Sequence, residues 1–110
     1  MIVGEHIIPV DELNRAIPQF WGPAGTFPTV SYQDVLNGKV APEFFKDKIV
    51  LIGATSPIVH DEYPTPYSTT NLVKSGALAT PGVEIQASII KTFLTDGWYR
   101  TVPPAVNVAF

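Results

Sequence analysis

The sequence contains no cysteine, which excludes disulfide bonds, thiolate nucleophiles and zinc sites built on cysteine. Charged residues make up only 15% of the 110 residues, and the formal net charge is -3. The basic residues are scattered, with Lys46 and Lys48 as the one close pair, so the basic stripe of a nucleic-acid-binding protein is missing. The same scarcity of basic residues disfavours binding to an anionic membrane surface.

Long apolar runs are also missing, and no unbroken stretch is long enough to span a membrane. No basic region and apolar core of a signal peptide follow Met1. The glycine-rich patterns that bind phosphate and the glycine-flanked serine of hydrolases are absent as well. The hydrophobic fraction of 45% nevertheless suffices for a buried core, so the chain is expected to form one domain over residues 1–110.

Two segments carry the strongest secondary-structure signals. Residues 48–53 contain four consecutive large aliphatic residues and end in Gly53, which predicts a central strand buried on both faces. In residues 82–96 apolar side chains recur at helical spacing between a proline and a glycine, which predicts a long amphipathic helix. A strand at 98–102 would complete a βαβ unit.

The remaining predicted elements are short. Residues 5–10 and 15–21 predict an N-terminal hairpin, with a proline that places the first strand at an edge. Ser31 is a good N-cap for a short helix, and Pro42 suits the first position of a further helical turn. The sequence therefore predicts an α/β domain with a mixed sheet.

A long polar loop at residues 54–80 separates the predicted central strand from the predicted helix. It begins at the carboxyl end of the strand, where open α/β sheets place their ligands. Two interpretations stay open, a ligand-binding loop and an ordered covering loop without a ligand. His60, Asp61 and Glu62 bring three metal-binding side chains together, but neighbours in an extended loop point apart, so no metal is expected. Asp61 is expected to accept backbone N–H bonds and stabilise the loop.

Catalytic chemistry has little support in the sequence. A hydrolase would need a cleft that joins His60 or His6 to a serine and an oxyanion site, and it is the least favoured alternative. The helix start at Thr80 and Pro81 offers free N–H groups to an anion, but Glu84 in the first turn would oppose it. We therefore expect no catalytic residues and no cofactor.

Several blocks of this sequence together resemble one domain family. The run Phe-Lys-Asp-Lys-Ile-Val-Leu-Ile-Gly-Ala-Thr at residues 45–55 resembles a motif of CHASE2 domains. Asp61, Thr65 and the Pro-Gly-Val-Glu-Ile-Gln-Ala run at residues 81–87 resemble later motifs of that family at suitable spacing. The resemblance spans about residues 20–104, and the ordered set of blocks is more specific than any single block.

This resemblance implies an extracytoplasmic signal-sensing domain of a bacterial transmembrane receptor, on the periplasmic or extracellular side of the cell membrane. The receptor's cytoplasmic output would be an adenylate cyclase or another cyclase, a histidine kinase or another kinase. Residues 1–110 would then be the C-terminal portion of the sensor domain, ending before a transmembrane segment, as the uncharged residues 101–110 also suggest.

The stimulus that the resemblance implies is an unidentified small molecule or another extracellular signal. The candidate ligand-binding residues are four polar residues of the family-like blocks: Thr55, Asp61, Thr65 and Glu84. The alternative is a structural or dimerising module without a small-molecule ligand, which would associate as a homodimer. Exposure of Trp98 and Tyr99 would favour that alternative.

Overall fold

The computed structural model describes residues 1–68 and 79–102. Residues 69–78 of the predicted loop and residues 103–110 of the predicted apolar tail lie outside the described residues. The chain divides into two compact units, and each is described by itself. The first consists of residues 1–20 and the chain from Ser88 onward, and the second of residues 21–87.

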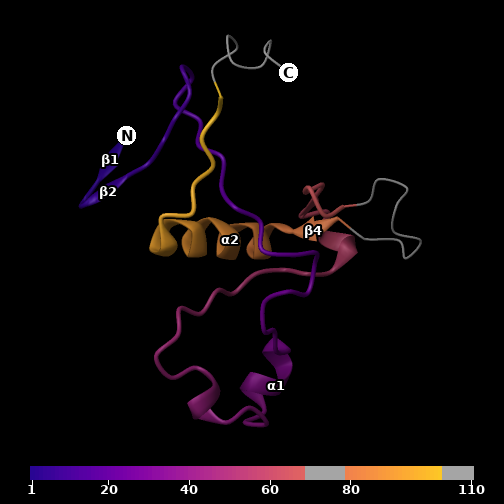
Figure 1. Ribbon diagram of the computed structural model, residues 1–110. Coiled ribbons are helices and arrows are strands. Elements are labelled where there is room, and N and C mark those ends of the chain that lie inside the picture. The colour runs from indigo at the N-terminus through magenta and orange to yellow at the C-terminus, as the bar shows by residue number, and fades with distance from the viewer. Residues whose placement is uncertain (69–78, 103–110) are drawn as a thin grey trace. The chain divides into compact units, whose positions relative to one another are not determined.

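The described residues contain both helices and short antiparallel strand pairs, so the predicted α/β class is confirmed (Figure 1). The elements are β1 (Ile2–Val3), β2 (His6–Ile7), α1 (Tyr32–Leu36), the 3-10 turns η1 (Pro42–Phe44) and η2 (Pro57–Val59), β3 (Glu62–Tyr63), β4 (Thr80–Pro81) and α2 (Gly82–Thr95). In place of one mixed sheet, the described strands form two separate antiparallel pairs, β1–β2 and β3–β4.

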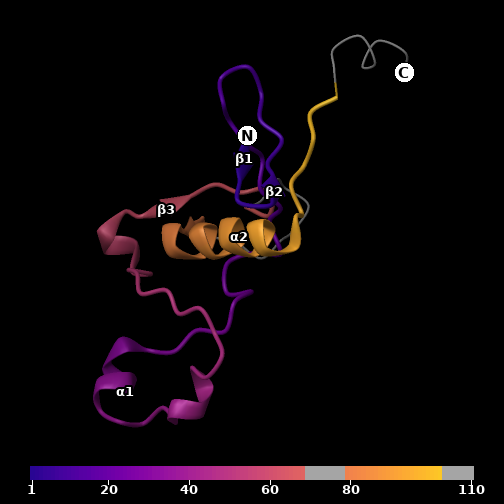
Figure 2. The same ribbon diagram turned by 90° about the vertical axis from the view of Figure 1, so that its left-hand side faces the viewer.

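The predicted N-terminal hairpin is present in the first unit, but its strands lie closer to the start of the chain. β1 and β2 form it, and Gly4 turns the chain with a φ of 61°, a conformation that glycine adopts without steric cost (Figure 2). The predicted strands at 5–10 and 15–21 are therefore not its two arms. From the second of them only Ile17 pairs, in an isolated bridge with Tyr99. The strand predicted at 98–102 is likewise reduced to that bridge.

The helix predicted for residues 82–96 is confirmed as α2, which has 14 residues. It ends one residue earlier than the sequence indicated, because Asp96 takes a left-handed conformation with a φ of 51°. Aspartate tolerates this conformation better than most residues. The N–H of Gly97 then donates to the carbonyl of Thr92 at 2.9 Å and closes the helix end.

The second unit contains the short helix α1 and the turn η1 where the sequence placed them. Ser31 takes the extended N-cap conformation, although its side chain makes no capping hydrogen bond. After α1 the chain turns at Gly38, whose φ is 67°, and η1 begins at Pro42 as predicted.

The prediction of a buried central strand at residues 48–53 is wrong. Those residues form no strand, and the exposed fractions of Ile49, Val50, Leu51 and Ile52 are 62%, 49%, 38% and 80%. Figure 2 shows the segment as an irregular trace on the way to β3. An aliphatic run becomes a buried strand only beside strands that satisfy its backbone and layers that cover its faces. Among the described residues no strand pairs with this segment, and the strands form only the pairs β1–β2 and β3–β4.

The most buried side chains of the described residues are largely polar. Ile8 is a buried aliphatic residue at 5% exposure, but Thr92 is fully buried at 0%. Ser88 and Thr80 are also buried, and Leu94 on the predicted apolar stripe of α2 is exposed. Hydroxyl groups that bond back to the chain therefore occupy positions that the apolar pattern did not indicate.

Candidate functional site

An open cleft of about 500 Å³ lies at the N-terminal end of α2, within the second unit. Its walls are formed by the exposed aliphatic segment at residues 49–52 with Gly53, by β3 with the preceding Asp61, and by the first turns of α2. The lining residues are Leu51, Ile52, Gly53, Asp61, Tyr63, Gly82, Val83, Ile85 and Gln86. The volume falls within the range of about 300–1,000 Å³ that is typical of small-molecule sites.

The pairing of β3 with β4 positions the polar end of the cleft. Glu62 lies opposite Pro81 and Tyr63 opposite Thr80 in antiparallel register. The carbonyl of Asp61 accepts the N–H of Gly82 at 2.9 Å, which extends the ladder by one bond into α2. The backbone therefore fixes Asp61 beside the first residue of the helix.

Two glycines let the walls of the cleft approach one another. A Cβ atom on Gly82 would lie 2.7 Å from both carboxylate oxygens of Asp61. A Cβ atom on Gly53 would lie 2.5 Å from the Cβ of Val83, closer than two carbon atoms can pack. Both positions accordingly require glycine for close packing rather than for an unusual backbone angle.

The chemistry of the lining residues suits binding. The aliphatic part of the wall consists of Leu51, Ile52, Val83 and Ile85. The polar groups are the Asp61 carboxylate, the Gln86 amide and the half-exposed Tyr63. An apolar wall with a few convergent polar groups binds a ligand by burial and orients it by hydrogen bonds. Among residues 1–68 and 79–102, no group of three or more metal-binding side chains is placed to hold an ion.

Of the four predicted ligand-binding residues, Asp61 lines the cleft. Thr65 is buried, and its hydroxyl lies 3.2 Å from that of Thr80 on β4. The hydroxyl of Ser68 accepts the N–H of Thr65 at 2.8 Å, and the carbonyl of Thr65 accepts the N–H of Ser68 at 2.9 Å. Thr65 thus fastens the loop after β3 to the strand that leads into α2.

The other two predicted residues lie away from the cleft wall. Thr55 is exposed and makes no hydrogen bond within the described part of the chain. Glu84, in the first turn of α2, accepts the N–H of Gly25 with both carboxylate oxygens at 3.0 Å. Glu84 therefore links the turn at Gly25 to the helix. A ligand-binding role for Thr55, Thr65 and Glu84 stays a prediction.

Sequence reasoning missed the aliphatic part of the cleft wall because it assigned Leu51, Ile52 and Val83 to a buried core. The residues it overlooked include Tyr63, Val83 and Gln86. A usable signal was present, since Gly53 and Gly82 each lie within a family-like block next to a branched aliphatic residue. Such a pair indicates two segments in close approach.

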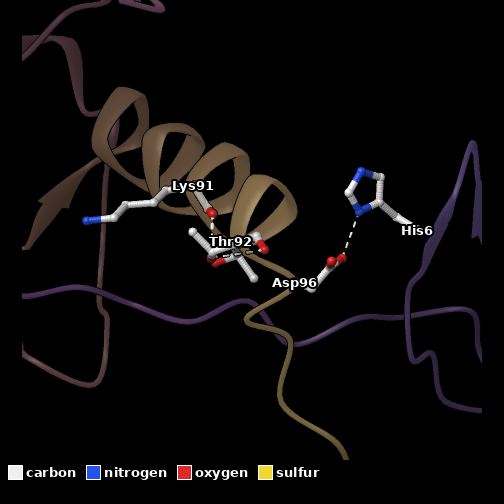
Figure 3. A network of polar contacts seen from close by, with 5 residues as sticks. His6, Lys91, Thr92 and Asp96 are labelled. Atoms are coloured by element: carbon white, nitrogen blue, oxygen red, sulfur yellow. Dashed lines mark hydrogen bonds and ion pairs between the residues drawn. The ribbon is translucent and has the colours of Figure 1, made fainter.

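A second group of contacts lies at the opposite end of α2, in the first unit. His6 Nδ1 lies 2.7 Å from an oxygen of Asp96, and Figure 3 shows the two side chains pointing toward each other. The His6 ring also packs against Phe93 with 4.5 Å between the ring centres. The buried Thr92 hydroxyl accepts the N–H of Gln19 at 3.1 Å and lies 2.7 Å from the carbonyl of Ser88. These contacts fix the last turns of α2.

The turn at residues 11–15 of the first unit is stabilised by hydrogen bonds to the carboxylate of Asp11. The N–H of Arg15 donates to a carboxylate oxygen of Asp11 at 2.9 Å, and Arg15 Nε donates to the other at 2.7 Å. These bonds, with a further one from the N–H of Leu13, stabilise the carboxylate and lower the pKa of Asp11 below its ordinary value of 3.8. The turn borders a smaller hollow of about 220 Å³.

Comparison with known proteins gives one result. The family model described as the CHASE2 domain matches residues 2–110, almost the whole chain. No curated protein and no solved structure matches the sequence. Within the described residues, no helix is both long enough and apolar enough to cross a membrane.

Proposed function

The chain belongs to the CHASE2 family of extracytoplasmic sensory domains, and from this premise we propose that it senses a small molecule in the cleft at the start of α2. CHASE2 domains are sensory rather than catalytic modules of receptors. In this proposal the chain has no enzymatic activity of its own and couples its stimulus to a cytoplasmic cyclase or kinase. It would act outside the cytoplasm as part of an integral membrane receptor.

The cleft itself is the observation that carries this proposal. It joins an aliphatic wall to a single carboxylate, Asp61, which the backbone bond from Gly82 holds in place. An anionic ligand would be repelled by Asp61, and a fully polar one would gain little from Leu51, Ile52 and Val83. The favoured ligand is a small molecule with an apolar body and an amine or another hydrogen-bond donor facing Asp61.

The same geometry suggests how occupancy of the cleft is transmitted. A ligand in the cleft would contact the first turn of α2 and so favour one position of that turn over another. The helix is continuous for 14 residues, about 21 Å at 1.5 Å per residue, and its last turn reaches the contacts of Thr92 and Asp96 (Figure 3). A displacement at its start would alter those contacts, which precede the C-terminal segment.

A thermal-shift screen of the 110-residue chain tests the proposal. We expect small apolar amines to raise the melting temperature and neutral analogues of the same shape to raise it less. Asp61→Asn should reduce the shift at least several-fold. Asp34→Asn is the matched control, because Asp34 is a half-exposed carboxylate outside the cleft, paired with Lys39 at 3.3 Å. Equal shifts in the two variants, or none in the parent chain, would contradict a ligand site at Asp61.

The alternative proposal is a structural or dimerising module without a small-molecule ligand. The extensive exposure of aliphatic residues in the second unit favours it, because contiguous exposed apolar surface marks interaction sites. Tyr99 is also exposed, although Trp98 is half-buried. Concentration-dependent association with no response in the ligand screen would favour this alternative over the first.

A further inference from the structure

Two of the polar side chains that line the cleft, Asp61 and Gln86, carry hydrogen-bonding groups that the protein itself leaves unused. Within residues 1–68 and 79–102, neither the carboxylate of Asp61 nor the amide of Gln86 forms a hydrogen bond or an ion pair. Asp61 is half-buried and Gln86 is exposed. Polar groups of a cleft that have no protein partner are available to orient a ligand.

The backbone of α2 sets the spacing between these two groups. A Cβ atom on Gly82 would lie 2.7 Å from both carboxylate oxygens of Asp61, so the carboxylate lies against the first residue of the helix. Gln86 follows Gly82 by about one turn on the same face of α2, about 6 Å along the axis at 1.5 Å per residue. Val83 and Ile85 add apolar wall along this stretch. One ligand can therefore reach both polar groups.

The charges of the cleft limit what each group can bind. Among the described residues that line it, Asp61 is the one charged side chain, and there is no lysine, arginine or histidine. A carboxylate or phosphate on the ligand would therefore lack a counter-charge, and so would a second ammonium beyond the one facing Asp61. The Gln86 amide is neutral and both donates and accepts hydrogen bonds, so it suits a hydroxyl or a carbonyl.

We propose that Gln86 is the specificity-determining residue of the cleft and selects ligands with one amine and, about 6 Å from it, one neutral hydrogen-bonding group. This inference rests on the proposed function, because it assigns the amine to Asp61. With bonds of about 1.5 Å, a chain of about four carbons places a hydroxyl oxygen at that distance from the nitrogen. Amino alcohols of this length represent the ligand class, whereas a plain alkylamine leaves the Gln86 amide without a ligand bond.

NMR titrations of the 110-residue chain with two series of amines test the spacing. Linear amino alcohols of about four carbons, and others two carbons shorter or longer, are each compared with the alkylamine that has a methyl group in place of the hydroxyl. The apolar chain is then common to both members of a pair. The hydroxyl should tighten binding several-fold at about four carbons and less at the other lengths. The same effect of the hydroxyl at every length would overturn the assignment of Gln86.

Substitutions test the role of the Gln86 amide directly. Gln86→Leu should abolish the advantage of the hydroxyl while the alkylamines still bind. Gln33→Leu, at an exposed position of α1 in the same unit, and Tyr63→Phe, which removes the other neutral polar group of the cleft, should both retain it. Gln86→Glu adds a second carboxylate and should reverse the preference, so that a diamine of the same length binds several-fold more tightly than the amino alcohol. Far-UV circular dichroism checks that α2 remains folded.

The outcomes separate this inference from the proposed function. If no amine binds, or if the alkylamines bind Asp61→Asn as well as the parent chain, the proposed function fails and the inference fails with it. If the alkylamines bind through Asp61 but Gln86→Leu and Gln86→Glu keep the parent's preference, the inference alone is overturned.

Discussion

Replacing Gly53 by alanine tests the close approach between the exposed aliphatic segment and α2. The new Cβ would lie 2.5 Å from the Cβ of Val83 and 2.8 Å from its Cγ2. Valine on a helix is held in one strongly preferred rotamer, so its side chain cannot swing aside cheaply. Either the segment or the start of α2 must move, and the wall of the cleft moves with it.

Two opposing effects set the expected size of the change. Overpacking of this kind costs about 1–3 kcal/mol in the free energy of unfolding. Alanine also restricts the unfolded chain, which stabilises the folded state by about 0.4–1 kcal/mol where the backbone angles allow it. The φ of Gly53 is not positive, so alanine can adopt the backbone, and the net loss should be about 1–2 kcal/mol.

Urea unfolding followed by far-UV circular dichroism measures this loss as a lower midpoint with an unchanged slope. Gly97→Ala is the matched control, because its Cβ would meet the flexible end of Gln19 at 3.0 Å. That variant should unfold close to the parent midpoint. If Gly53→Ala were as stable as Gly97→Ala, the steric reasoning about the cleft wall would be refuted.

Three further predictions concern Thr92, Asp11 and Glu84. Thr92→Val removes the buried hydroxyl that accepts the N–H of Gln19 and should lower the free energy of unfolding by about 1–3 kcal/mol, whereas Thr95→Val at an exposed position should change it by less than about 0.5 kcal/mol. Because the pKa of Asp11 is lowered in the folded chain, its stabilising effect is present above the ordinary pKa and is lost as pH falls through the folded value. Asp11→Asn should therefore unfold at lower urea than the parent at neutral pH, the difference should shrink as the pH falls below the ordinary pKa of Asp11, and a constant difference would contradict the assignment. Glu84→Gln weakens both the bonds from Gly25 and the favourable charge in the first turn of α2, which should cost about 0.5–1 kcal/mol at low salt and less at high salt.

If these contacts behave as expected, α2 connects two chemically different ends. Its first turn borders a cleft with an apolar wall and the Asp61 carboxylate, and its last turns carry the buried Thr92 and the pair of His6 with Asp96. A sensory domain needs an element that both a ligand and the outgoing chain can bias. The continuous helix is the natural candidate for that element.

The amino-acid sequence by itself determined the features that depend on neighbouring residues. The helical spacing of residues 82–96 predicted α2 to within one residue, and Ser31 and Pro42 marked the starts of α1 and η1. The family-like blocks indicated the CHASE2 family, and its family model matches residues 2–110. Helix periodicity, caps and motifs are local properties, so one sequence suffices to identify them.

Only the tertiary structure decided which apolar and polar groups are covered. In the structure Ile49–Ile52 are exposed and Thr92 is buried. Asp61 lines the cleft, whereas Glu84 accepts a hydrogen bond from Gly25. Burial depends on partners that are distant along the chain, and a strand cannot supply the hydrogen-bonding neighbour that it requires. An aliphatic run is therefore compatible with a buried strand, but only the tertiary structure determines whether other residues cover it.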